Sequence, residues 1–493
     1  MRSSEAYQLA MHTQNQYRGT VIACQYIVPP EFAQLSALAA LQRRFRHALE
    51  QVVLAQPHLQ AGIVGENPAT PAFVRLPVLD MHDNVEWITL HTNSYLQELY
   101  TAKLQAQLDA KFENISRTPG WRVVVLHKAG TESLEVLYVW NHVHHDCSSG
   151  KIFHQQLLRH LNETIDIEEP VVDAVDHCER WIVNLSDLTD KFPPNPELLT
   201  SWPMSPTFAV SELWRRLKPE RFFPPGDVHA HWAPIQATPY KTRMRNFIFD
   251  DDDVTRILSA CRQNHTTVTG LVHALCLVSL STALQDARGF ASRTPYDLRQ
   301  ILPSNTKSYP WLDPKETMCN YISVIDHEFS AKLVDTIRSY IPPSSSSSDA
   351  PPPAVMPTIW SVAARVRQEI QSRLDAGTKN NPIAIVKSCP DWNVQQQREM
   401  HGTRYLSWQV TNLGVLDGQS SASELDKTEA WSIRRAGLVQ SAGTAAAALS
   451  VSVMTLKGGE MCVACTWQDA AVGVEIGERL VGELERWLMG IGA

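Results

Sequence analysis

Basic residues are outnumbered in this sequence and regularly spaced cysteines are missing, and both shortages exclude whole classes of protein. The 44 Lys and Arg face 52 Asp and Glu, which gives a formal net charge of -8. A general nucleic-acid binder needs a basic face, so we expect no nucleic-acid partner. The nine cysteines have no framework spacing, which favours free thiols in a reducing cytosol. We therefore expect a cytoplasmic protein.

Long hydrophobic runs are also missing. Residues 1–19 lack the apolar core of a signal peptide. The best candidate for a membrane span, 271–284, is short and is interrupted by His273, Ser279 and two further hydroxyl residues. This pattern predicts a buried helix and no membrane span.

The length of 493 residues exceeds one ordinary hydrophobic core and favours two domains. Apolar positions recur at helical spacing over 32–54 and 474–488, while 121–127 and 134–140 are strand-like runs around a turn. Helices and hairpins without regular alternation predict the α+β class.

Proline-rich stretches divide the chain. Residues 186–242 carry several proline clusters and little periodicity, which predicts a connection between domains at 1–185 and 243–493. The low-complexity stretch 341–357 predicts a disordered insertion.

The most informative stretch is Asn141–Gly150, NHVHHDCSSG, which lies between the strand-like run and a predicted helix over 152–161. As an HxxxD motif it contains His142 and Asp146. A histidine there can take a proton from a hydroxyl because its pKa lies near neutrality. Asp146 can fix the turn through backbone N–H groups or a cation, and Gly150 lets the chain enter the helix without a Cβ close to a substrate.

The same residues also fit HxHxD, in which His142 and His144 are zinc ligands of a hydrolase. Cys147 then stands where such a site places another histidine, and further ligands are needed downstream. Histidines without a chemical role are the third possibility. We favour proton transfer and expect no metal.

Further motifs extend the pattern along the chain. The helix after HxxxD-x-x-S-G ends in Leu161–Asn162, and YDLR at 296–299 precedes CNYIS at 319–323, with VTNLG at 410–414. In this order the motifs resemble the HxxxD acyltransferase superfamily, which includes chloramphenicol acetyltransferase, the plant BAHD acyltransferases and peptide-synthetase condensation domains. The chain looks most like the fungal alcohol acetyltransferase branch.

The resemblance implies two chloramphenicol-acetyltransferase-like sandwich domains, with mixed sheets flanked by helices and a tunnel at their interface. It implies an O-acyltransferase that moves an acyl group, above all acetyl, from a CoA or carrier-protein thioester to a hydroxyl of a small lipophilic natural product; an amine acceptor stays open. His142 is then the general base, Asp146 pairs with Arg299, and Asn412 donates to the oxyanion. Acyl-CoA is a co-substrate, no cofactor is bound permanently, and the protein is a monomer.

Departures from the family pattern remain. Cys147 and Cys319 replace glycines, and the DFGWG sequence of the plant branch is absent. The crowding that Cys147 introduces keeps one more alternative open, a non-catalytic relative that binds a ligand in the tunnel.

Overall fold

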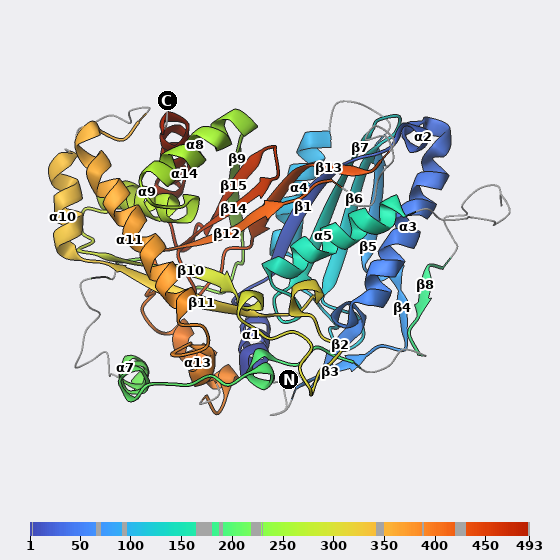
Figure 1. Ribbon diagram of the computed structural model, residues 1–493, viewed down its shortest axis with the longest axis horizontal. Coiled ribbons are helices and arrows are strands. Elements are labelled where there is room, and N and C mark those ends of the chain that lie inside the picture. The colour runs from blue at the N-terminus through green and yellow to red at the C-terminus, as the bar shows by residue number, and fades with distance from the viewer. Residues whose placement is uncertain are drawn as a thin grey trace.

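Two lobes lie side by side in the computed structural model (Figure 1), each built on one mixed sheet. The structure describes residues 1, 3–65, 71–90, 96–163, 180–186, 191–217, 228, 230–341, 350–386, 389–419 and 430–491. The sheets carry helices on their faces, so the predicted α+β class is confirmed.

The N-terminal lobe contains a five-stranded sheet of order β13-β1-β7-β6-β5. Its strands alternate between two apolar layers, as a sheet covered on both faces requires. Tyr138 and Trp140 face α3 and α5, while Leu137 and Val139 face α4. The elements are β1 (Gly19–Ile27), β5 (Val85–Leu90), β6 (Trp121–Lys128), β7 (Ser133–Asn141), β13 (Ser432–Gln440), α1 (Ser3–Thr13), α3 (Leu38–Ala55), α4 (Leu96–Asp109) and α5 (Cys147–Asn162).

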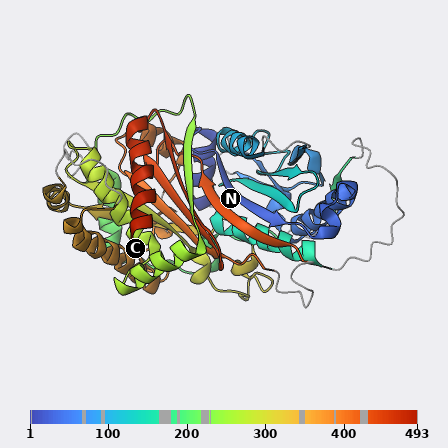
Figure 2. The same ribbon diagram turned by 90° about the horizontal axis from the view of Figure 1, so that it is seen from above.

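The C-terminal lobe contains a six-stranded sheet of order β11-β10-β12-β14-β15-β9. Its main helices lie on the side of the sheet away from the other lobe (Figures 1 and 2). The elements are β9 (Thr242–Phe249), β10 (Phe290–Asp297), β11 (Ile322–Phe329), β12 (Trp408–Leu416), β14 (Leu449–Leu456), β15 (Met461–Gln468), α8 (Asp251–Gln263), α9 (Val268–Ala283), α10 (Ala331–Tyr340), α11 (Met356–Asp375) and α14 (Val474–Gly490).

Helix α9 is buried on almost all sides, because α11, α14 and the sheet pack around it. The predicted buried helix at 271–284 is therefore confirmed. No single helix in the described ranges is long and apolar enough to cross a membrane; α8 and α9 pass that test only together, and they meet at 87°.

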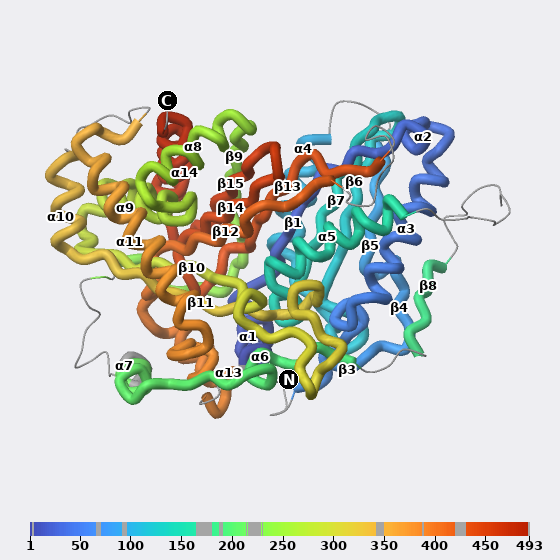
Figure 3. The backbone as a smooth tube through the Cα atoms, in the orientation of Figure 1, coloured from blue at the N-terminus to red at the C-terminus, as the bar shows by residue number. Residues whose placement is uncertain are grey.

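One strand crosses between the lobes. β13 follows β12 in the chain but pairs with β1 from Thr20↔Gln440 to Ile27↔Ser432, and Figure 3 traces the chain across. A division at residue 243 therefore leaves one strand of the N-terminal sheet in the C-terminal half. Exchange of a strand ties the lobes together through backbone hydrogen bonds.

One expectation for the proline-rich stretches is corrected. The connection 186–242 contains α6 (Pro196–Leu199) and the longer α7 (Pro206–Leu217). In the predicted insertion 341–357, residues 342–349 lie outside the described part of the chain. The disorder predicted for its end is wrong: Val355 is fully buried and α11 begins at Met356. Proline in the first turn of a helix removes no needed N–H, so Pro357 favours that helix start.

Smaller elements complete the described fold. They are α2 (Pro30–Ala33), β2 (Ala61–Val64), β3 (Ala72–Arg75), β4 (Val78–Asp80), β8 (Ile182–Asn184), α12 (Ile383–Val386) and α13 (Trp392–Met400).

Candidate active site

The HxxxD motif forms the turn between β7 and α5. Asp146 is the N-cap of α5, and its Oδ1 accepts a hydrogen bond from Ser149 N at 2.8 Å. Capping by a carboxylate satisfies one of the free N–H groups of the first turn. Helix α5 therefore begins at Cys147, five residues before the predicted start at 152, and the whole motif is held at a helix entrance.

Asp146 and Arg299 meet in the core between the lobes. Arg299 Nη1 donates to Asp146 Oδ2 at 2.6 Å, and Tyr321 N donates to the same oxygen at 2.8 Å. Burial alone would raise the pKa of Asp146, but the Arg299 guanidinium and the hydrogen bonds outweigh it and hold that pKa below its usual value. The carboxylate therefore links the start of α5 to two segments of the C-terminal lobe, one at Arg299 and one at Tyr321.

His142 lies at the same junction and is almost fully buried. Asn320 Nδ2 donates to His142 O at 2.5 Å and lies 3.3 Å from the ring Nδ1. The Tyr17 ring meets the imidazole edge-on, with centroids 5.7 Å apart. Nε2 has no hydrogen-bond partner among the described residues.

The charge state of His142 follows from its surroundings. Burial lowers its pKa, and the Asp146 carboxylate opposes that effect only in part. The imidazole is therefore neutral near pH 7. A hydrogen bond from the ring to the backbone carbonyl of His142 itself places the ring proton on Nδ1, so Nε2, which has no partner among the described residues, is the nitrogen that can accept a proton.

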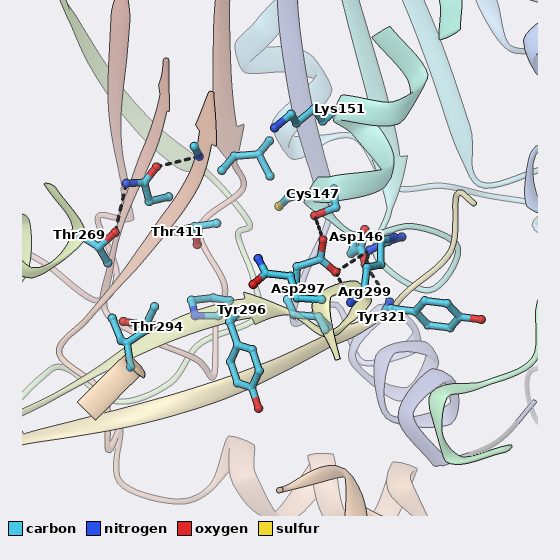
Figure 4. A pocket seen from close by; sticks show the side chains of 18 of the residues that line it. Asp146, Cys147, Lys151, Thr269, Thr294, Tyr296, Asp297, Arg299, Tyr321 and Thr411 are labelled. Atoms are coloured by element: carbon cyan, nitrogen blue, oxygen red, sulfur yellow. Dashed lines mark hydrogen bonds and ion pairs between the residues drawn. The ribbon is translucent and has the colours of Figure 1, made fainter. Parts of the chain in front are cut away.

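A cavity of about 780 Å³ lies between the lobes. Figure 4 shows its wall, which α5, β10, β12, α11 and β13 supply. His142 itself is absent from the wall, although Asp146 and Cys147 belong to it. The wall includes the polar or charged residues and the one cysteine Asp146, Cys147, Lys151, Thr294, Asp297, Arg299, Lys315, Arg367, Gln371, Thr411, Asn412 and Gln440.

Asn412 lies in the cavity wall on β12. Its Oδ1 accepts from Gly414 N at 2.9 Å, and its Nδ2 donates to Thr269 Oγ1 at 3.1 Å (Figure 4). These bonds fix the amide with one N–H left over, a donor suited to a developing oxyanion. His142 and Asn412 belong to different lobes, and no hydrogen bond joins them directly.

Gly150 has a different role from the one expected. A Cβ at this position would lie 2.8 Å from the Trp140 ring and 2.9 Å from Ile22 Cδ1. The prediction of a clearance for substrate is wrong, because Gly150 faces the core. It allows α5 to pack closely on β7 and β1.

The other two motif histidines point into the protein. His144 Nε2 lies 3.1 Å from Ala61 O, and His145 Nδ1 lies 3.0 Å from Tyr138 Oη. Both oxygens of Asp146 already accept hydrogen bonds, and no group of three His, Cys, Asp or Glu in the described ranges could hold a metal ion. The side-chain arrangement gives the HxHxD zinc alternative no support.

Sequence reasoning missed several residues of the site. Asn320 contacts His142 although it lies 178 residues further along the chain. Tyr17 contacts the same ring from the N-terminal region. Lys151, Lys315 and Arg367 line the cavity, and their side chains have no hydrogen bond or ion pair within the described part of the chain. Only Asn320 carried a signal, as the asparagine of the CNYIS stretch.

Comparison with known proteins identifies the family. The alcohol acetyltransferase family profile matches residues 91–480, so the chain belongs to that family and is an acyltransferase. It is 28% identical over 459 residues to a probable alcohol acetyltransferase FCK4 of Fusarium pseudograminearum, covering 91% of this chain and 86% of that protein. A probable alcohol acetyltransferase crmB of Aspergillus fumigatus is 23% identical over 421 residues, 83% of this chain and 82% of the relative. The predicted family membership is confirmed.

Solved structures share the fold. TRI3 trichothecene 15-O-acetyltransferase from Fusarium sporotrichioides superposes with a TM-score of 0.68 at 13% identity, covering 98% of this chain and 93% of that one. The first condensation domain of the CDA synthetase gives 0.57 at 11% identity, with 100% and 96% covered. The predicted two-lobed architecture is confirmed by these likenesses.

Proposed function

We propose that this acyltransferase moves an acetyl group from a thioester to the hydroxyl of a small molecule, with His142 as general base. The observation that carries the proposal is the neutral, buried imidazole with an unpartnered Nε2 at the junction of the lobes. Asn320 and the Asp146–Arg299 pair hold the turn that presents it.

The reaction needs one proton carrier and one oxyanion donor. His142 Nε2 takes the acceptor's O–H proton while that oxygen attacks the thioester carbonyl carbon. The free N–H of Asn412 stabilises the oxyanion. As the C–S bond breaks, the imidazolium returns the proton to sulfur, so an ester and a free thiol leave the site. A lowered pKa makes the imidazolium a ready acid for this second step.

The donor we propose is acetyl-CoA. Lys151, Lys315 and Arg367 come from α5, the turn at 314–316 and α11, and all three line the cavity. Three cations at one cavity attract the phosphates of a CoA thioester, although Asp297 offsets part of the charge of Lys151. A carrier-bound phosphopantetheine also has one phosphate.

The acceptor we propose is an alcohol, because both relatives are described as probable alcohol acetyltransferases. A small lipophilic natural product fits the apolar side chains of the wall, among them Ile152, Ile370 and Leu413. An amine is the less favoured acceptor. Because the two lobes supply the whole cavity, we also propose a monomer, working in the cytoplasm.

The first test is His142→Ala, assayed with acetyl-CoA and a panel of alcohols. Loss of the general base should reduce kcat about 10²–10⁴-fold while the thermal unfolding curve keeps its position. His47→Ala, at an exposed position on α3, is the matched control and should retain full turnover.

Two results would contradict the assignment. Normal turnover in His142→Ala removes the general base from the proposal. A wild-type protein that binds CoA thioesters but transfers no acyl group supports the non-catalytic alternative that Cys147 raised.

A further inference from the structure

Cys147 and Gln440 lie next to each other in the cavity wall, and we call this pair the constriction. Both are buried and line the cavity, and Gln440 Nε2 lies 3.8 Å from Cys147 Sγ. They come from the first turn of α5 and the last residue of β13, so the crossing strand places one of them. In Figure 4 the Cys147 sulfur points away from α5 into the cavity.

Tyr17 links the constriction to the base. Its ring contacts the His142 imidazole. Burial raises the pKa of Tyr17, with smaller effects from a Thr20 hydrogen bond, the Cys147 thiol and Gln440, so Tyr17 lies close to both members of the constriction. Tyr17 is therefore the side chain that joins the constriction to His142.

Neither member can move aside at low cost. Gln440 Oε1 accepts from Thr411 Oγ1 at 3.0 Å, and from Gln409 Nε2 and Ser452 Oγ at 3.4 Å each. Rotating the Gln440 side chain would break this set and leave buried polar groups unpaired.

Cys147 adds side-chain volume to the constriction at a position that the backbone fixes. Its Cβ is set by the backbone of the first helical turn, so no rotamer clears it. Burial raises the pKa of the thiol, which therefore stays neutral. The cysteine presents a small, uncharged surface at a position where the motif's usual glycine would present none.

From this geometry we infer that the constriction sets the length of the acyl group that fits beside His142, admitting acetyl and excluding longer chains. The inference rests on the proposed function. A tightly packed wall discriminates against each extra methylene by about 10–200-fold in kcat/KM. Cys147 and Gln440 are thus specificity-determining residues for the donor.

The test compares acetyl-, butanoyl- and hexanoyl-CoA with one fixed alcohol. The wild type should prefer acetyl-CoA, and Cys147→Gly and Gln440→Ala should each raise the butanoyl-to-acetyl ratio of kcat/KM about 10-fold. Gln440→Leu restores the volume and should restore the preference. Gln371→Ala removes the same side chain from the α11 side of the wall and should leave the ratio unchanged. Cys147→Ala serves if glycine weakens the start of α5.

The outcomes separate the two proposals. An active wild type whose ratio stays fixed in Cys147→Gly, Cys147→Ala and Gln440→Ala overturns the constriction and leaves the proposed function standing. A change in preference among acceptors of different size, with no change among donors, also overturns it. Absence of turnover with every thioester in the wild type overturns both.

Discussion

Buried histidines beside the HxxxD turn differ from those behind the cavity wall in how their ring nitrogens are hydrogen-bonded. In the N-terminal lobe, His58 Nε2, His144 Nδ1 and His145 Nε2 are buried without a hydrogen-bond partner in the part of the chain that the structure describes. In the C-terminal lobe, His273 and His327 have partners at all four ring nitrogens. The first set lies beside the turn that presents His142; the second lies behind the cavity wall.

The C-terminal histidines form a chain with one direction. Trp408 Nε1 can only donate, so His273 Nδ1 accepts at 3.0 Å. Burial lowers the pKa of His273 well below its usual value, so the ring is neutral and carries its one proton on Nε2. This N–H donates a hydrogen bond to Thr294 Oγ1 at 2.8 Å. Thr294 then donates to His327 Nε2 at 3.0 Å, and His327 Nδ1 donates to Glu369 Oε2 at 2.6 Å.

The difference in hydrogen bonding reflects two roles: the fully bonded histidines stabilise the fold, and the incompletely bonded ones lie beside the catalytic turn. A fully satisfied buried network rigidifies the elements that it joins, here α9, β10, β11, α11 and β12. Unsatisfied buried nitrogens are expensive and persist where another constraint decides the sequence. Beside the HxxxD turn, that constraint is the presentation of His142.

Acidification should cause the largest loss in the free energy of unfolding, and we expect it to act mainly through the buried histidines of the N-terminal lobe. Burial lowers the pKa of His58 to about 4 and that of His144 to about 3. Below pH 6.5 the unfolded chain binds protons at these histidines and the folded protein does not. Their contribution is therefore complete above pH 6.5 and is lost as the pH falls toward 4 and then 3.

Urea unfolding between pH 7 and 5 measures this loss, since most carboxylates stay ionised in that range. Each such histidine should lower the free energy of unfolding by up to about 1.4 kcal/mol per pH unit. His58→Gln should flatten the dependence. A free energy that stays constant over this range refutes the prediction.

Thr294→Val should produce the next largest effect, in the C-terminal lobe. Val has a similar shape but leaves His273 Nε2 and His327 Nε2 unpaired, so we expect a loss of about 3 kcal/mol in the free energy of unfolding. Thr336→Val removes a solvent-exposed hydrogen bond to Lys332 O and should change it by about 0.5 kcal/mol or less. Equal losses in the two variants would mean that the chain is not a stabilising network.

Glu369→Gln should have the smallest effect. The carboxylate ends the chain at a partly exposed position, and a glutamine oxygen still accepts from His327 Nδ1. We expect a loss of about 0.5 kcal/mol, because solvent compensates an exposed partner. A loss as large as that of Thr294→Val would show that the chain depends on the charge at its end.

The apolar run at 134–140 predicted β7, because a strand covered on both faces is apolar along its whole length, which is a local pattern. The HxxxD turn was also readable, since strand, motif and helix are consecutive. Gly150 was misread because its neighbours, Trp140 and Ile22, meet it only after α5 packs on the sheet.

The sequence by itself determined the class, the family, and the residues from His142 to Asp146 at a strand end. Only the tertiary structure decided which distant groups meet them: Arg299 on Asp146, Asn320 on His142, and Gln440 against Cys147. The physical reason is that all three contacts join segments that meet only when the lobes pack together, and Gln440 reaches Cys147 because β13 leaves its neighbours in the chain to pair with β1. Such a long-range pairing depends on β1 of the other lobe being available as a partner, and no local pattern in residues 432–440 predicts it.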